Sequence, residues 1–131
     1  ADLREFVRHQ AGGHCEYCRF PDQFATLRFH LDRVVPGQHG GEYSATNCAW
    51  SCPECNSRKL SNLGSVDPNT REKVWLFDPR NQSWHDHFRW DGARIVGTSA
   101  VGRATARLLQ INAPHRVIAC GNLIEAGLLA Q

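Results

Sequence analysis

The stretch Cys15-Glu-Tyr-Cys18, followed after a gap of 33 residues by Cys52-Pro-Glu-Cys55, decides how this chain folds. Each Cys-x-x-Cys pair presents two sulfur atoms from one tight turn, and two such pairs supply the four ligands of a closed tetrahedral zinc site. We therefore expect a structural zinc ion on these four cysteines. Iron, or a pair of disulfide bonds, is the alternative use of the same residues.

Length and composition place the chain among ordinary globular proteins. Its 131 residues are most simply one domain with a moderate core, and 41% hydrophobic and 21% charged residues are typical of soluble proteins. The net charge of +2 permits binding to nucleic acid without requiring it. There is no apolar run of the roughly 20 residues that a membrane span needs, and no secretory signal. Cysteines arranged as metal ligands favour a reducing compartment, so we expect a cytoplasmic protein that does not bind membranes.

The residues around the two cysteine pairs predict the order strand, loop, strand, helix. A helix over residues 2–10 precedes the first pair. The alternating apolar residues 27–35 predict a strand, residues 37–44 a polar loop, and residues 47–51 the returning strand. Pro53 then favours the first turn of a helix that carries Asn56 and Lys59.

The remaining residues predict a smaller α+β extension. In order, we expect a loop over 62–70, a strand over 74–77, a helical turn over 83–87, a hairpin over 89–96 around Asp91-Gly92, a helix from a cap at Thr98 or Ser99 to about residue 111, and a final helix to about residue 129. We find no repeat and no flexible linker. Residues 1–62 should therefore form a core, and residues 63–131 should pack on it within one compact domain.

For several other residues we predict a buried, packing or surface position and no catalytic or metal-binding role. We expect Cys48 and Cys120, which lie in apolar segments, to be small buried hydrophobes. His85 and His87 are two positions apart on a helical turn and diverge, so they should be surface or packing residues. The tryptophans are expected to be core and interface anchors. They are Trp50, Trp75, Trp84 and Trp90.

These motifs resemble the HNH (His-Asn-His) endonuclease family, whose core is the ββα-metal fold. Zinc-bound members carry two Cys-x-x-Cys pairs around an acidic residue on a strand, a Gly-Gly loop, an Asn, and a helix that starts Cys-Asn-x-x-Lys. The matching positions here are Asp32-Arg33-Val34-Val35-Pro36, Gly40-Gly41, Asn47 and Cys55-Asn56-Ser57-Arg58-Lys59. Segments 76–80, 84–88, 90–92 and 97–105 also resemble the tail of bacterial members. The resemblance implies an α+β fold: a zinc-stapled ββα-metal core with an additional β-hairpin and two C-terminal helices.

The resemblance also implies an activity, the metal-dependent hydrolysis of phosphodiester bonds in double-stranded DNA. By this resemblance Asp32 and Asn56 would hold a Mg²⁺ or Mn²⁺ ion, for which oxygen donors are suited. Asn47 would pin the loop by hydrogen bonds. Arg58 and Lys59 would contact phosphates, although a basic pair at a helix end can equally be a solvated surface.

Arg33 is where this chain departs from the family pattern. The family places a His directly after the acidic residue, and that His is the general base. A guanidinium stays protonated, with a pKa above about 12, and has no lone pair with which to take a proton from water. Arg33 can instead bind a phosphate through two hydrogen bonds.

Three explanations for Arg33 stay open. The protein could be a natural DNA-binding member that has lost cleavage, another His could be the base, or Arg33 could be an inactivating substitution. His30 lies two residues before Asp32, on the same face of the strand, and His39 lies in the loop before Gly40. Both are candidate bases, although each is more often an anchor or a solvent-facing residue.

Two non-catalytic functions compete with a nuclease. The first is a zinc-containing DNA-binding or adaptor module that retains the HNH scaffold. The second is a structural zinc domain that binds protein. Homo-oligomers or larger assemblies are compatible with either function and with a nuclease.

Overall fold

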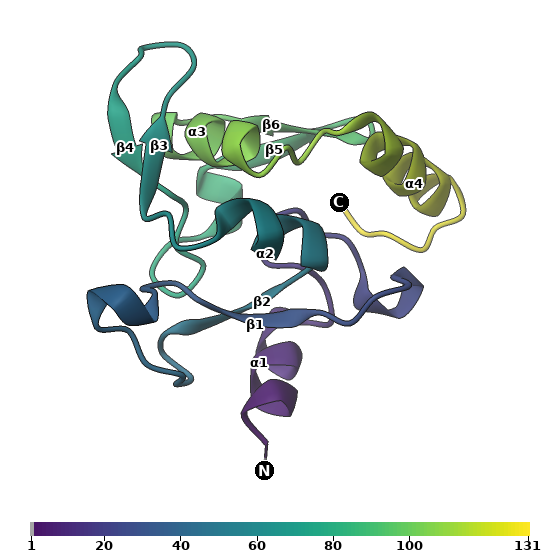
Figure 1. The fold of residues 1–131 in the computed structure, drawn as a ribbon. Helices are drawn as coiled ribbons and strands as arrows, with labels where there is room; N and C mark the ends of the chain where they lie inside the picture. The colour runs from purple at the N-terminus through teal and green to yellow at the C-terminus, as the bar shows by residue number, and fades with distance from the viewer. Residues whose placement is uncertain (1) are drawn as a thin grey trace.

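The structure, a computed structural model, describes residues 2–131 and has an α+β fold. Its helices and strands are α1 (Leu3–Ala11), β1 (His30–Arg33), β2 (Cys48–Ser51), α2 (Pro53–Lys59), β3 (Gly64–Val66), β4 (Lys73–Trp75), β5 (Phe88–Asp91), β6 (Arg94–Gly97), α3 (Ala100–Leu108) and α4 (Pro114–Glu125). The strands form three antiparallel pairs, β1 with β2, β3 with β4 and β5 with β6. In Figure 1, α2 lies between the β1–β2 pair and a layer that contains α3, β5 and β6. The predicted fold class, with its ββα core, added hairpin and two C-terminal helices, is confirmed.

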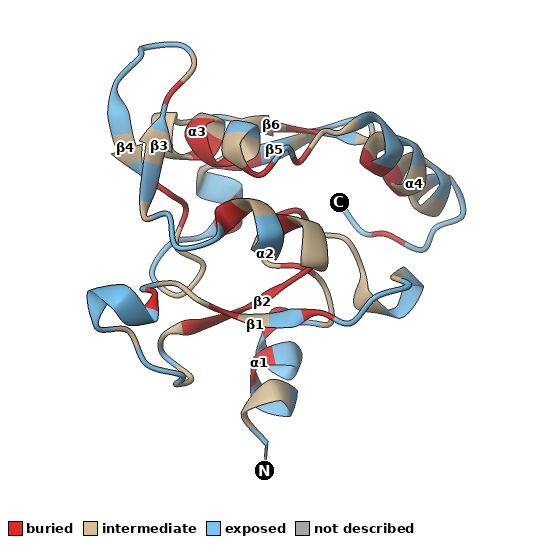
Figure 2. Cartoon of the chain, viewed as in Figure 1, coloured by how far each residue is buried: buried red, intermediate tan, exposed pale blue. Residues whose placement is uncertain are grey.

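The β1–β2 pair is shorter than the predicted strand over residues 27–35. Before β1, the carbonyl of Phe29 accepts a hydrogen bond from Arg4 of α1 (3.1 Å). After β1, the amide of Val35 bonds to the side chain of Asn47 (2.9 Å). Pairing with β2 is therefore limited to four residues, among which Asp32 is opposite Ala49. All four residues of β2 are buried (Figure 2).

The helices next to the cysteines have clear end signals. The Asp2 side chain accepts a hydrogen bond from the amide of Arg4 at the start of α1, and Gly12, in a left-handed conformation, ends that helix. In α2, the sulfur of Cys52 accepts from the amide of Cys55 (3.4 Å), so the second cysteine pair is itself the helix cap. Pro53 occupies the first turn, as predicted.

Strand β3 was not predicted, and the last helix is shorter than predicted. The region 62–70 was predicted as a loop, but Gly64–Val66 pairs with β4. A turn closed by the backbone of Asp67, which bonds to the amide of Arg71 (2.8 Å), brings these two short strands together. Helix α4 ends at Glu125, four positions before the predicted end, and Gly127 is left-handed there.

Aromatic side chains join the two halves of the chain into one core. Trp84 stacks on Phe88, with ring centroids 5.1 Å apart, and its indole N–H donates to the carbonyl of Tyr17 (2.9 Å). Tyr17 in turn contacts the edge of Phe77. Trp75 is the exception, because it is 72% exposed on β4 and is not the core anchor that we expected.

Within residues 2–131, every helix is too short or too polar to cross a bilayer.

Candidate metal centre and nuclease site

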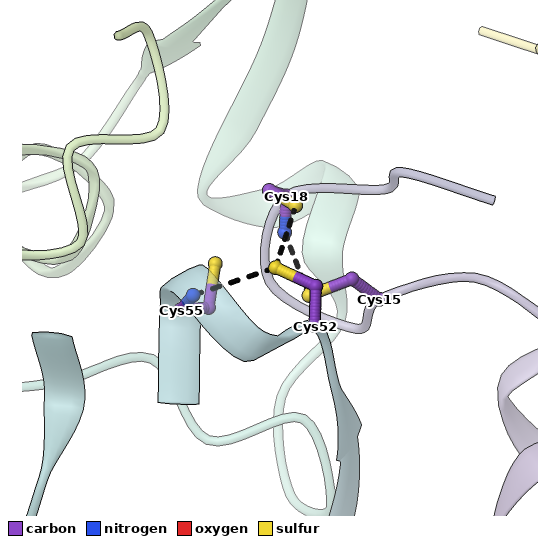
Figure 3. A group of neighbouring side chains, drawn as sticks. All are labelled: Cys15, Cys18, Cys52 and Cys55. Atoms are coloured by element: carbon purple, nitrogen blue, oxygen red, sulfur yellow. Dashed lines mark hydrogen bonds between the residues drawn. The ribbon is translucent and has the colours of Figure 1, made fainter. Parts of the chain in front are cut away.

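The four cysteines of the two Cys-x-x-Cys pairs converge in the core, as Figure 3 shows. Their sulfur atoms lie within 4.8 Å of one another, and all four residues are buried. Within each pair the second amide points at the first sulfur, at 3.5 Å for Cys18 to Cys15 and 3.4 Å for Cys55 to Cys52. All six cysteines of the chain are free, so the disulfide alternative is not formed. Four convergent, buried sulfur donors fit the tetrahedral coordination of structural zinc.

Even without a bound metal, the electrostatics of this cluster favour the ionised form of at least one cysteine. Hydrogen bonds from the other three cysteines hold the pKa of Cys52 well below its ordinary value, whereas burial raises the pKa of Cys15 and hydrogen bonds within the cluster raise that of Cys55. The positive N-terminal end of α2 also lies here, because Cys52 is its cap and Cys55 is in its first turn. The site is therefore prepared for negative sulfur and for the cation that would balance it.

Asp32 is buried in the second predicted metal site, with both carboxylate oxygens occupied. The Tyr17 hydroxyl donates to one oxygen (2.6 Å) and the Lys59 ammonium to the other (3.2 Å). The side chains of Asp32 and Lys59 are only 5% and 2% exposed. Burial raises the pKa of Asp32 above its ordinary value, even though Lys59 and Tyr17 stabilise the ionised form. In this arrangement Lys59 takes the place next to Asp32 that a divalent cation would need.

Asn56 lies three residues before Lys59 on α2 and is partly buried. Residues three apart are neighbours on a helix surface, so Asn56 shares the side of α2 from which Lys59 reaches Asp32. The predicted pair of oxygen donors, Asp32 and Asn56, therefore comes from the two elements that face each other here.

Asn47 closes the loop between β1 and β2 with three side-chain hydrogen bonds. Its amide oxygen accepts from the backbone of Val35 (2.9 Å), and its amide nitrogen donates to the carbonyls of Val35 (3.0 Å) and Glu42 (2.9 Å). Gly41 is required beneath it, since a Cβ there would lie 1.6 Å from the Val35 oxygen. Asn47 thus fixes both ends of the loop that follows Asp32 and Arg33.

Comparison with known proteins identifies this unit. Residues 15–62 match the family model described as HNH endonuclease. Over these residues the chain is similar to HNH endonucleases. The matched segment begins at the first ligand of the cysteine cluster and ends just after α2, so it includes both candidate metal sites and Asn47. No curated protein and no solved structure gave a significant match to the chain.

Arg33 lies against the loop that Asn47 closes. Its guanidinium stacks over the ring of Tyr43, 4.3 Å from the centroid. It also fills the space beside Gly37, where an added Cβ would be 2.7 Å from Arg33 Nη1. Neighbouring residues of a strand point to opposite faces, so Arg33 leaves β1 on the face opposite Asp32.

The two candidate bases, His30 and His39, are both exposed. His30 is at the start of β1 and shares the face of Asp32, because side chains alternate along a strand. His39 ends the short turn Gly37–His39, and its ring lies beside the side chain of Gln38 (3.3 Å). Of the two, His30 shares a strand face with Asp32.

Arg58 and Lys59 were predicted to contact phosphates, but both form hydrogen bonds within the protein. Arg58 donates to the carbonyls of Leu109 (3.2 Å) and Gln110 (3.4 Å), which ties α2 to the end of α3. Lys59 points inward to Asp32 and to the carbonyl of Arg33 (3.4 Å). Either side chain would have to leave these partners to reach a phosphate.

Two residues that were not predicted complete these sites, Tyr17 and Arg116. Tyr17 lies inside the first cysteine pair, and that position was the available signal. Arg116 donates to Cys18 and Cys52. It is 64 positions from Cys52 and lies in no recognisable sequence motif, so nothing in the sequence indicated this contact.

Proposed function

We propose that this chain is a metal-dependent HNH endonuclease of double-stranded DNA in which Arg33 weakens cleavage. The match of residues 15–62 to the HNH family carries this proposal. The assembled cysteine cluster and the buried Asp32 of β1, which Lys59 of α2 contacts, support it. The proposed cofactors are a structural Zn²⁺ on the four cysteines and a Mg²⁺ or Mn²⁺ ion at Asp32 and Asn56.

The structural role of zinc follows from the positions of its ligands. The first cysteine pair follows α1 and the second caps α2, so a bound ion would fix α2 relative to the N-terminal segment. Because β2 runs directly into Cys52, the same ion would hold β1 and β2 against α2. The strand that carries Asp32 and the helix that carries Asn56 would thereby be kept together.

The chemistry at Asp32 depends on an exchange of partners. A divalent ion at Asp32 and Asn56 would polarise the phosphodiester and stabilise the charge that develops on it. A divalent ion at Asp32 would repel the Lys59 ammonium, so Lys59 would have to give up its hydrogen bond, whereas the Tyr17 bond to the other oxygen could stay. Lys59 would then be released close to the backbone of Arg33 and could contact the DNA backbone.

Arg33 would bind substrate but would not activate water. Its guanidinium can donate two hydrogen bonds to a phosphate, and it has no basic lone pair. His30 shares the face of Asp32 and is the better candidate for a residual base. Loss of a well-placed general base slows hydrolysis on the order of 100-fold to 10,000-fold.

A non-catalytic DNA-binding or adaptor module is the second candidate. The observation that favours it is the ion pair between Asp32 and Lys59, which neutralises the carboxylate without a metal. Together with Arg33, this pair would leave a scaffold that contacts DNA and does not cut it.

Cleavage of supercoiled plasmid with Mg²⁺ or Mn²⁺ separates these functions. We expect Arg33→His to cut on the order of 100-fold to 10,000-fold faster than the wild-type chain. His30→Ala would be introduced into both the wild-type chain and Arg33→His. It should abolish residual wild-type cutting and leave the Arg33→His rate much higher than wild type.

Each other outcome has a definite meaning. Equal cutting by wild type and Arg33→His would show that position 33 does not carry the base. A mobility shift of DNA at low salt without any cutting by either protein would favour the adaptor module. If neither protein cuts or shifts DNA, the DNA-binding proposal is wrong.

A further inference from the structure

Arg116 of α4 reaches back across the molecule to the cysteine cluster. Its side chain is buried, and its two terminal nitrogens donate to Cys18 Sγ (2.9 Å) and Cys52 Sγ (3.5 Å). These two sulfurs belong to different Cys-x-x-Cys pairs. One guanidinium from the C-terminal extension therefore contacts both halves of the cluster.

Two further groups fix the orientation of this guanidinium. The carboxylate of Glu54, in the first turn of α2, accepts a hydrogen bond from Arg116 Nη2 (2.8 Å). The ring of Phe20 covers one face of the guanidinium, with the centroid 4.6 Å away. With a carboxylate at its edge and an aromatic ring on its face, Arg116 has little freedom to turn away from the sulfurs.

The charge of the cluster explains what such a cation would do. Four thiolates carry more negative charge than one zinc ion neutralises, and excess charge in a buried site is costly. The guanidinium of Arg116 keeps its positive charge when buried, and it lies against two of these sulfurs. A permanent cation at hydrogen-bond distance from two ligands would offset that cost and orient the sulfurs, as outer partners of metal ligands do.

We propose that Arg116 is a positioning residue of the zinc site and couples zinc retention to the docking of α4 on the core. This inference rests on the zinc ion of the proposed function. Coupling is reciprocal, so whatever Arg116 adds to zinc binding, zinc adds to the docking of α4. His115, its neighbour on α4, also contacts Glu54 (2.7 Å). No sulfur contact accompanies that bond, which makes His115 the natural control.

The test is the rate at which zinc-loaded protein releases zinc to a chromogenic chelator. We expect Arg116→Gln to release zinc about 10-fold to 100-fold faster than wild type, as for other partners of metal ligands. Arg116→Lys keeps the charge but not the two-pronged contact, and should fall between these rates. His115→Ala should stay within about twofold of wild type, as surface substitutions do. In the same samples, amide exchange in residues 114–125 should be faster in Arg116→Gln than in His115→Ala.

Several results would overturn the inference. Equal release rates for wild type and Arg116→Gln would do so, and so would equal acceleration by Arg116→Gln and His115→Ala, which would assign the effect to Glu54. If Arg116→Gln does not fold, Arg116→Lys carries the test, and a wild-type release rate in that variant contradicts us. Wild-type protein that binds no zinc would refute the zinc site itself, which is a separate failure from unchanged release by a zinc-loaded variant.

Discussion

The two ends of α2 hold two clusters of chemically active side chains that are built in opposite ways. At its N-terminal end, Cys52 and Cys55 meet two more sulfurs, and the nearest protein cation, Arg116, stands outside the cluster. At its C-terminal end, Lys59 is already inside the cluster and holds Asp32. The first site needs an external cation to balance it, whereas the second is balanced by the protein. A zinc ion would therefore be part of the fold, while a catalytic ion has to compete with a lysine.

The helix itself favours this division. The aligned peptide dipoles of α2 leave its N-terminal end positive, which suits thiolates, and its C-terminal end negative, which suits an ammonium group. The helix is only seven residues long, from Pro53 to Lys59. Any distortion of one cluster therefore bears on the placement of the other.

Loss of the metal should be the largest effect. We expect chelation, or Cys55→Ser, to remove on the order of 10 kcal/mol from the free energy of unfolding, because metal binding and folding of such a site are one process. Near-ultraviolet circular dichroism reports it, since Trp50 and Trp84 are buried in the same core. Cys120→Ser is the matched control, a buried cysteine outside the cluster. If the chelated protein still shows a cooperative thermal transition, the cysteine cluster does not need an external cation. The contrast with the Asp32 site would then be wrong.

Removal of the lysine should have an intermediate effect. Lys59→Met leaves Asp32 buried without its cationic partner and should lower the free energy of unfolding by about 3 kcal/mol in urea with zinc present. The double variant Asp32→Asn with Lys59→Met should recover part of this loss, because neither charge is then left unpaired. Strictly additive losses would mean that Asp32 and Lys59 do not act as a pair. They would thereby remove the contrast between the two ends of α2.

The pH dependence of Asp32 should be the smallest effect. Burial raises its pKa, so the folded chain binds a proton that the unfolded chain has already released. Stability contributed by Asp32 is therefore present at low pH and falls as the pH rises from the unfolded value of about 4 through the raised folded value. The urea midpoint of wild type, compared with that of Asp32→Asn, should therefore be highest at low pH. This difference should shrink or change sign as the pH rises through the range. A wild-type advantage that grows with pH would show that Lys59 outweighs burial.

The sequence predicted well those features that depend on local chemistry. The spacing of the four cysteines was enough to place them in one cluster, and Asp91-Gly92 placed the β5–β6 hairpin. Ser99 caps α3 as expected, by accepting from the amide of Gly102 (3.0 Å). In each case the residues that form the feature are the same residues by which it is recognised in the sequence.

The missed features depend on contacts between distant segments. Lys59 follows Arg58 at a helix end, and that pattern is shared by solvated surfaces. Only the packing of α2 on β1 turns Lys59 inward to Asp32. Arg116 is recognisable as a partner of the cysteines only after α4 is placed beside α2. Strand β3 is three residues long and depends on the Asp67 turn, so it had no periodicity to detect.

Metal analysis of three purified proteins tests the contrast between the ends of α2 most directly. Wild type, Cys55→Ser and Asp32→Asn would each be dialysed without chelator and their zinc measured per chain. We predict one zinc ion per chain in wild type and in Asp32→Asn, and none in Cys55→Ser, because one cluster of four sulfurs is assembled. Wild type without zinc, zinc retained by Cys55→Ser, or zinc lost from folded Asp32→Asn would contradict the account.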